Sequence, residues 1–180
     1  MRGIFHNFEV TALPHLHAAY KLARLLTRNE KDAEDIVQEA FLRAFRHFGS
    51  FHGGDARPWL LTIVRNTYYT WMQHNRSFDL QTALNEEIVA HDDSNPETLL
   101  LKEAESALLR KALEELSPEF RELIVLREFE ELSYKQIAKV AMIPIGTVMS
   151  RLARARRHLK RILSAQLNAQ TPKEVELGTV

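Results

Sequence analysis

The sequence predicts an all-α protein that consists of two small helical domains joined by a flexible linker. Apolar residues recur at helical spacing in the patterned segments of the 180 residues, and no segment alternates clearly as a strand does. A polar, acidic stretch interrupts this pattern near the middle, as is typical of a linker. We therefore expect a first domain at residues 1–79, a linker at 80–96, a second domain at 97–168 and a tail at 169–180.

Three helices are predicted in the first domain. Apolar spacing marks one helix over 16–26 and another over 33–48, which stops near a glycine. The stretch SFHGGDARP follows, and its glycines and proline predict a loop. The third helix covers 59–76, and five of its residues line one inward face: Leu60, Ile63, Val64, Thr67 and Trp71.

Three sequence signals mark the starts of helices in the second domain. Ser94 and Glu97 form a capping-box pattern that starts a helix running to about residue 116. The Ser-Pro pair at 117–118 starts the next helix. Ser133 and Gln136 form a second capping box, which opens a short helix.

Charge is strongly polarised along the chain, although the net charge is zero. Residues 84–131 hold fourteen acids and five bases, a net charge of −9. Residues 132–173 hold nine bases and no acid, a net charge of +9. A solvated basic face is the simplest alternative, but so long a run without an acid favours an anionic partner. The opposite charges also predict that the domains close together when no partner is bound.

A helix-turn-helix is predicted where the basic segment begins. The short helix 134–142, the turn IPIG and an amphipathic helix from Thr147 onward have its spacing. The last helix has an apolar stripe of Val148, Leu152, Ala155, Leu159 and Ile162. Its opposite face carries Ser150, Ala153, Arg154, Arg157 and Arg161. In this architecture the N-terminal half of the second helix enters the major groove of DNA. A basic coiled-coil edge or a helical hairpin remains the alternative.

The third helix of the first domain carries a polar and aromatic outward face. Its residues are Thr62, Arg65, Asn66, Tyr69, Gln73 and Arg76, and no acid lies between residues 56 and 78. Bases stack on aromatic rings and phosphates pair with arginine, so this face suits single-stranded nucleic acid. The alternative is that Trp59, Tyr68 and Tyr69 belong to the core or its boundary.

No sequence pattern indicates catalysis, a metal or a cofactor. There is no cysteine, phosphate-binding loop or nucleophile motif, and the histidines are scattered. No run reaches the length of a membrane span, and the first residues do not resemble a signal peptide. We therefore expect a cytoplasmic protein that is not an enzyme and does not insert into membranes.

The chain resembles bacterial sigma factors of the extracytoplasmic-function (ECF) group. Four blocks in order and at matching spacing carry the resemblance: DAEDIVQEAFLRAFRHFGSF (32–51), WLLTIVRN (59–66), LSPEFRELIVLREFEELSYKQIAKV (116–140) and IPIGTVMSRLARARRHLK (143–160). In this family the first domain, sigma region 2, holds the clamp of core RNA polymerase and opens the −10 element. The second domain, sigma region 4, binds the polymerase flap and reads the −35 element.

The resemblance implies roles for individual residues. Asp35, Gln38 and Glu39 would face the clamp helices of core RNA polymerase. The loop from Phe51 to Arg57 would help to select a flipped base of the −10 element, and Trp59, Arg65 and Asn66 would lie near the strand opening. Together with residues from the outward face of the 59–76 helix, these give the expected −10 set: Phe51, Trp59, Thr62, Arg65, Asn66, Tyr69 and Arg76.

The resemblance places a second set of residues against the −35 duplex. The resemblance implies Thr147, Ser150, Arg151 and Arg154. Arg157 is added because it lies on the outward face of the same predicted helix. Many members carry a base where this chain has Met149, so one contact to the −35 element differs here. The family is commonly held by an anti-sigma factor, which is therefore an expected partner besides core polymerase and promoter DNA.

Two other functions have weaker support. One is a response-regulator output protein, which shares the helix-turn-helix pattern but needs a regulatory domain in front of it. Residues 1–80 contain three predicted helices and no strand, which does not fit a receiver domain. The other is a helical adaptor that binds only protein, and it leaves the basic C-terminal helix unexplained.

Overall fold

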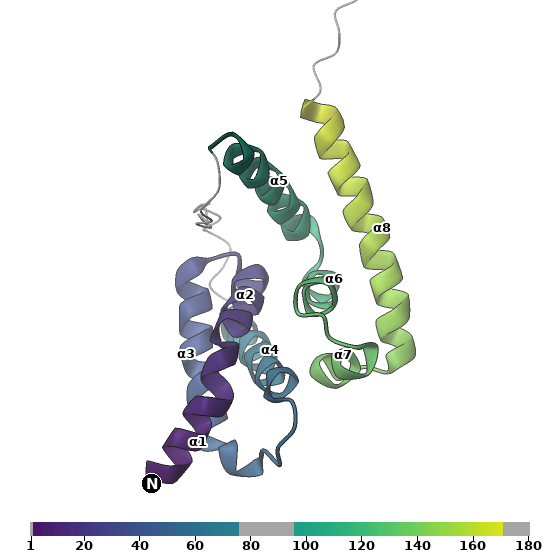
Figure 1. Ribbon diagram of the computed structural model, residues 1–180. Coiled ribbons are helices and arrows are strands. Elements are labelled where there is room, and N and C mark those ends of the chain that lie inside the picture. The colour runs from purple at the N-terminus through teal and green to yellow at the C-terminus, as the bar shows by residue number, and fades with distance from the viewer. Residues whose placement is uncertain (1, 76–95, 171–180) are drawn as a thin grey trace, which may run out of the picture.

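The computed structural model describes residues 2–75 and 96–170 (Figure 1), and every regular element in these ranges is helical. The predicted linker up to residue 95, Ser94 of the first capping box, Arg76 and the last ten residues of the tail lie outside them. Within them, no helix is long and apolar enough to span a membrane.

The first domain is built around three helices whose existence the sequence predicted. They are α2 (Leu16–Thr27), α3 (Glu30–Arg46) and α4 (Ala56–Asn75), and each packs against the other two. Asn29 caps α3 by accepting a hydrogen bond from the backbone N–H of Asp32 at 3.1 Å. A short 3-10 turn, η2 (Phe48–Ser50), follows α3, and the predicted loop connects it to α4.

A fourth helix, α1 (Arg2–Ala12), corrects the expectation of a three-helix domain. It runs into a 3-10 turn, η1 (Leu13–His15), before α2. Phe8 anchors α1: its ring makes edge-to-face contacts with Phe41, Phe45 and Phe48 at centroid distances of 5.3–6.3 Å. Such aromatic pairs stabilise beyond their buried area. One buried aromatic residue thus secures a helix whose short apolar pattern does not stand out in the sequence.

The second domain begins with α5 (Pro96–Glu115) and α6 (Pro118–Ile124), which continues as a π-helical turn, η3 (Val125–Phe129). Then come α7 (Tyr134–Ala141) and the long α8 (Ile145–Gln170). The predicted capping box of Ser133 and Gln136 is present in full. Met142 ends α7 in the left-handed region at φ 53°, which turns the chain toward α8. The helix-turn-helix is therefore confirmed, with α8 beginning two residues before Thr147.

The two domains lie against each other through helices that are distant in the sequence. Figure 1 shows α4 beside α7 and α2 beside α6, and both pairs are in contact. Buried residues of the first domain, such as Leu26 and Tyr68, belong to the same apolar cluster as Leu116 and Leu123 of the second. This contact brings polar residues of both domains together at a shared interface.

Candidate nucleic-acid interfaces

The recognition helix α8 has the amphipathic arrangement that its sequence predicts. Val148, Leu152 and Ala155 are buried, and Leu159 and Ile162 pack at the edge of the core. The predicted −35 residues lie on the rest of the helix. Ser150, Arg154 and Arg157 are exposed, whereas Thr147 and Arg151 are half-buried. The structure thus brings the five together on the outer side of one helix.

Acidic residues of the same domain flank the recognition helix. The guanidinium of Arg151 lies 3.2 Å from a carboxylate oxygen of Glu119 on α6. Arg156 pairs with Glu128 on η3 at 2.7 Å. Among the described residues, Arg154 and Arg157 lie within ion-pair distance of no carboxylate, and each hydrogen-bonds a backbone carbonyl one turn back. Arg154 and Arg157, in the middle of the outer face, are therefore available to an external anion.

The −10 face on α4 is only partly as predicted. Thr62, Asn66 and Trp59 are half-buried on the expected side, and the rings of Phe51 and Trp59 lie 4.9 Å apart. The buried face of α4 is rotated from the predicted inward face, because it includes Leu61 and Tyr68. The alternative that these aromatics belong to the core or its boundary thus holds for all three, because Tyr68 is buried and Trp59 and Tyr69 pack against the edge of the core.

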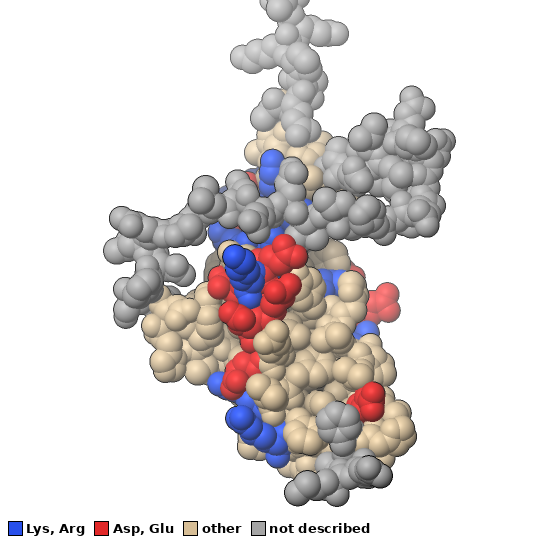
Figure 2. Space-filling model, turned by 90° about the vertical axis from the view of Figure 1, so that its left-hand side faces the viewer, with Lys and Arg blue, Asp and Glu red and all other residues tan. Residues whose placement is uncertain are grey.

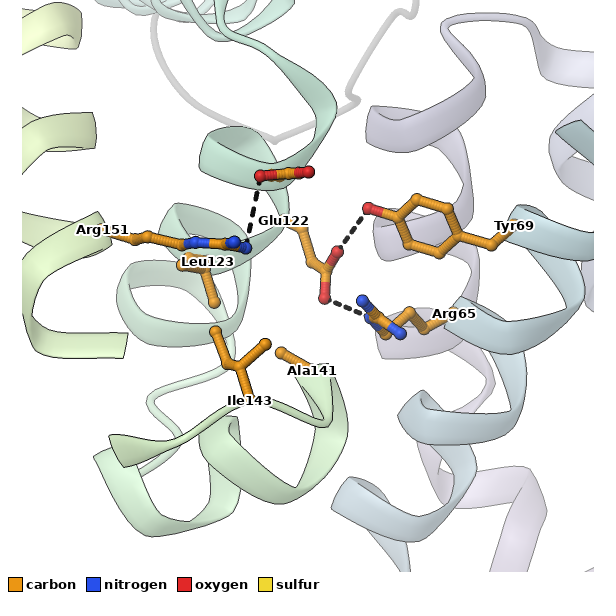
Figure 3. A pocket seen from close by; sticks show the side chains of 8 residues that line it. Arg65, Tyr69, Glu122, Leu123, Ala141, Ile143 and Arg151 are labelled. Atoms are coloured by element: carbon orange, nitrogen blue, oxygen red, sulfur yellow. Dashed lines mark hydrogen bonds and ion pairs between the residues drawn. The ribbon is translucent and has the colours of Figure 1, made fainter. Parts of the chain in front are cut away.

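Arg65 and Tyr69, two of the predicted −10 residues, hold a carboxylate from the second domain. Arg65 Nε donates to Glu122 Oε1 at 2.5 Å, and the Tyr69 hydroxyl donates to Oε2 at 2.8 Å. Figure 3 shows Glu122 of α6 pointing between these two side chains of α4. The Arg65 guanidinium also lies 4.6 Å from the centroid of the Tyr69 ring, a cation–π distance.

The environment of Glu122 is unusual for a charged group. Its side chain is 2% exposed. Burial raises the pKa of Glu122 above its ordinary value, and the contacts with Arg65 and Tyr69 oppose that rise. Burial and the neighbouring Glu122 carboxylate together raise the pKa of Tyr69, so that its hydroxyl remains a donor.

Arg121, the neighbour of Glu122 on α6, is buried and hydrogen-bonds backbone carbonyls from both domains. Within its own domain it donates to the carbonyls of Leu113, Glu114 and Leu116 at 2.7–2.8 Å. Its Nη1 donates across the interface to Leu25 at 2.9 Å, at the last turn of α2. Burial lowers the pKa of Arg121 to about 10, so the guanidinium stays charged at neutral pH. The carbonyl end of each helix carries partial negative charge, which this cation offsets.

A second buried acid, Glu130, also faces the first domain. It lies 3.2 Å from Lys21 of α2 and 3.9 Å from Arg57 of α4. Nearby, the Gln136 side chain donates to Asp55 at 3.1 Å. The sequence predicted closure between the acidic segment 84–131 and the basic segment 132–173. Among residues 2–75 and 96–170, acids of the first of these segments pair across the interface with cations of the first domain. The pairs between the two segments in these ranges lie inside the second domain.

The residues predicted to contact polymerase lie on α3. Asp35 and Gln38 are exposed, whereas Glu39 is half-buried and accepts a hydrogen bond from Arg43 Nε at 2.6 Å. Glu30 and Glu34 of the same helix are exposed as well. Figure 2 looks at this side of the molecule and shows acidic side chains gathered there with basic ones among them.

Two family models match the chain, and curated relatives agree with them. Sigma-70 region 2 matches residues 12–78, and sigma-70 region 4 matches residues 106–159. The chain is 33% identical to the RNA polymerase sigma-H factor of Pseudomonas aeruginosa over 92% of its own length and 91% of the relative's. It is 37% identical to the ECF RNA polymerase sigma-E factor of Escherichia coli K12, over 76% and 78%. The match to the ECF sigma factor SigE of Mycolicibacterium smegmatis, at 36% identity, covers 83% of this chain but 59% of that longer protein.

Solved structures of sigma factors share the fold. The sigma factor RpoE of Bartonella quintana, solved with the anti-sigma factor NepR, superposes with a TM-score of 0.73 at 29% identity over 88% of this chain and 97% of that one. CnrH, solved with the cytosolic domain of CnrY, gives a TM-score of 0.61 at 25% identity over 91% and 89%. Because residues 12–78 match sigma-70 region 2, they do not form the receiver domain that a response regulator requires. The chain belongs to the ECF group of bacterial RNA polymerase sigma factors.

Proposed function

We propose that this sigma factor binds core RNA polymerase in the cytoplasm, reads the −35 and −10 elements of promoters, and opens the −10 duplex. The observation that carries this proposal is the presence in one chain of two faces suited to nucleic acid, with exposed arginines on α8 and polar and aromatic side chains on α4. Sigma factors are initiation factors without catalysis of their own, so the polymerase supplies the chemistry.

The −35 element is read in this proposal by the N-terminal half of α8. Ser150 and Arg154 are exposed one turn apart on that half. Arginine pairs bidentately with guanine in the major groove, and serine permits close approach. Arg157 and Arg161, further along the helix, contact phosphates, which adds affinity without sequence information.

Strand opening at the −10 element is assigned to α4 and the loop before it. Unstacking a base step costs a few kcal/mol. Capture of the extruded base and stacking on aromatic rings offset that cost. Phe51 and Trp59, whose rings are in contact beside the loop, are the aromatic residues placed for this role. Arg65, Asn66 and Tyr69 hold the displaced strand.

Core polymerase is held through the exposed acidic face of α3, with Asp35, Gln38 and Glu39 against the clamp helices and the second domain against the flap. An anti-sigma factor is the expected regulator. Supporting this, the RpoE neighbour was solved with an anti-sigma factor.

The proposal is tested by DNA selection with reconstituted holoenzyme. The full chain is mixed with bacterial core polymerase and fragments of the source genome, and the bound fragments are sequenced. We expect enriched fragments to share two short motifs at a fixed spacing, with selectivity at one base position of the upstream motif relaxed in an Arg154→Ala holoenzyme. Enrichment no different from that of core polymerase alone would refute the proposal.

A further inference from the structure

We propose that this sigma factor reads its −35 element partly through thymine methyl groups, which pack against an apolar row on α8 formed by Ile145, Met149 and Ala153. The inference rests on the proposed function, because it takes the N-terminal half of α8 as the −35 face. It goes further by naming the chemical group that this half recognises besides the base that Arg154 reads.

Two rows of residues lie side by side on the outer face of α8. Residues four apart in a helix are neighbours on its surface, so Ile145, Met149 and Ala153 form one row. Ser150 and Arg154, each one position later, form the adjacent polar row. All five residues are exposed. The surface proposed to enter the major groove therefore presents an apolar row beside a polar one.

The apolar row lies outside the core of its own domain. Met149 is 54% exposed and Ile145 is 43% exposed, whereas Val148 and Leu152 on the inward face are at most 1% exposed. Single exposed apolar residues are ordinary on a protein surface. Here two large ones lie one turn apart and continue into an alanine, so the row offers a continuous apolar surface to an external group.

The charges around the row favour a polyanion as the partner. The row leads into Arg157, and Arg154 lies beside it. In the described parts of the chain neither arginine lies within ion-pair distance of a carboxylate. Arg156, on the inner edge of the row, is instead paired with Glu128 at 2.7 Å. Cations available to an external anion therefore flank the row on its outer side, as binding to DNA requires.

The place of the row at the start of α8 favours contact with bases rather than phosphates. The N-terminal residues of a recognition helix reach base edges, and Ile145 is the first residue of α8. Among the four ordinary bases, the C5 methyl of thymine is the apolar group that the major groove presents. Ile145 and Met149 lie about 6 Å apart along the helix axis. This distance is close to two base-pair steps of about 3.4 Å each. We therefore expect one or two thymines near the base that Arg154 reads.

The test combines a methyl deletion in the DNA with a side-chain deletion in the protein. Selection with wild-type holoenzyme first defines the upstream motif. Each thymine of that motif is then replaced by deoxyuridine, which lacks the methyl group and keeps the hydrogen-bonding groups of the base. Affinities of wild-type and Met149→Ala holoenzymes for the thymine and uridine duplexes complete a double-mutant cycle. At one position or more, uridine should weaken wild-type binding about two- to fourfold, as expected for one buried methyl group. M149A should show no such difference there.

The controls separate a methyl contact from a general loss of binding. Val10→Ala shortens an aliphatic side chain of α1 that is 63% exposed, and it should keep the full difference between thymine and uridine. Met149→Leu keeps an apolar side chain and should keep most of the difference, whereas the polar Met149→Gln should lose it. Uridine in the spacer between the two motifs should have no effect. Circular dichroism checks that each variant is folded.

Three results would overturn the inference: an upstream motif without thymine, equal affinity for thymine and uridine at every position of the motif, or a difference that M149A retains in full. Each of them leaves the proposed function standing, because the selected motif itself demonstrates promoter recognition. Failure of wild-type holoenzyme to select any motif would instead refute the proposed function, and this inference with it.

Discussion

At the scale of single residues, two neighbours on α6 have the least expected roles. Arg121 and Glu122 are adjacent charges in the sequence, a pattern typical of a solvated helix surface. In the structure both are buried at the domain interface, one against backbone carbonyls and one against Arg65 and Tyr69. Neither periodicity nor charge signals this, because both partners of Glu122 and one carbonyl partner of Arg121 come from a domain some fifty to a hundred residues earlier in the chain.

Arg154 and Arg161 are expected to differ although both are exposed arginines of α8. The N-terminal half of a recognition helix lies deepest in the groove. Arg154→Ala should cost about 1–3 kcal/mol of promoter binding and relax selectivity at one base position. Arg161→Ala should weaken binding evenly over all sequences or leave it unchanged. Binding of both variants to a panel of single-base −35 changes measures this, and equal, sequence-independent losses would contradict the assignment.

Replacement of Arg121 should lower the stability of the second domain itself. Arg121→Met removes a charged donor from several carbonyls at the end of α5, and we expect a loss on the order of 3 kcal/mol in the free energy of unfolding. Arg121→Lys should recover part of it, because an ammonium cannot reproduce the guanidinium fork. Urea unfolding of both variants, with exposed Arg161→Ala as the control, gives the values. An R121M chain as stable as the control would show that these hydrogen bonds are dispensable.

At the scale of secondary-structure elements, α3 and α8 are amphipathic helices with opposite outer charge. The exposed residues of α3 include Glu30, Glu34 and Asp35, whereas those of α8 include Arg154 and Arg157. The buried faces of both follow from the 3.6-residue period, which explains why the sequence was sufficient to predict them. Opposite outer charges fit opposite partners, a basic clamp helix for α3 and a phosphate backbone for α8.

Reversal of charge on α3 should abolish polymerase binding. Asp35 and Glu39 lie four residues apart and share a face, so Asp35→Arg with Glu39→Arg changes one continuous surface. The second change also replaces the partner of Arg43, which is a half-exposed pair and should cost little stability. Affinity for core polymerase is the measurement, with circular dichroism as the check on folding. A double variant of Glu9 and Glu131, both exposed, carries the same charge change and should bind normally. Unchanged affinity of the α3 variant would remove this surface from the interface.

Helices and loops that depend on local signals are predictable from the sequence, whereas those that depend on distant contacts are not. Capping by Ser133 and Gln136, the apolar stripe of α8 and the loop before α4 are local signals, and the structure contains all three. Helix α1 was missed because its attachment depends on Phe8 meeting three aromatic rings from 33 or more residues later. The inward phase of α4 was only partly right, because Leu61 and Tyr68 are covered by neighbours that the pattern of α4 alone does not specify.

At the scale of the whole molecule, charges of opposite sign lie on the facing surfaces of the two domains. Lys21, Arg57 and Arg65 of the first domain face Glu122 and Glu130 of the second. Of these cations, Arg65 also belongs to the proposed −10 face. A zero net charge for the chain thus conceals surfaces of opposite sign.

The radius of gyration of the free protein should increase with salt. The Lys21–Glu130 pair is about one-third exposed on the lysine side and is open to screening. The Debye length falls from about 10 Å at 0.1 M salt to about 3 Å at 1 M, so the attraction between the domains weakens. Small-angle scattering at both salt concentrations measures the change. A chain that is extended at low salt and does not change would contradict closure by charge.

We propose that this chain directs core polymerase to start transcription at particular sites. Run-off transcription measures this directly, with purified chain, bacterial core polymerase and genomic fragments as templates. We predict discrete transcripts from a subset of fragments that require the chain and are weakened with Arg154→Ala. The absence of any chain-dependent start site across the source genome would contradict the claim.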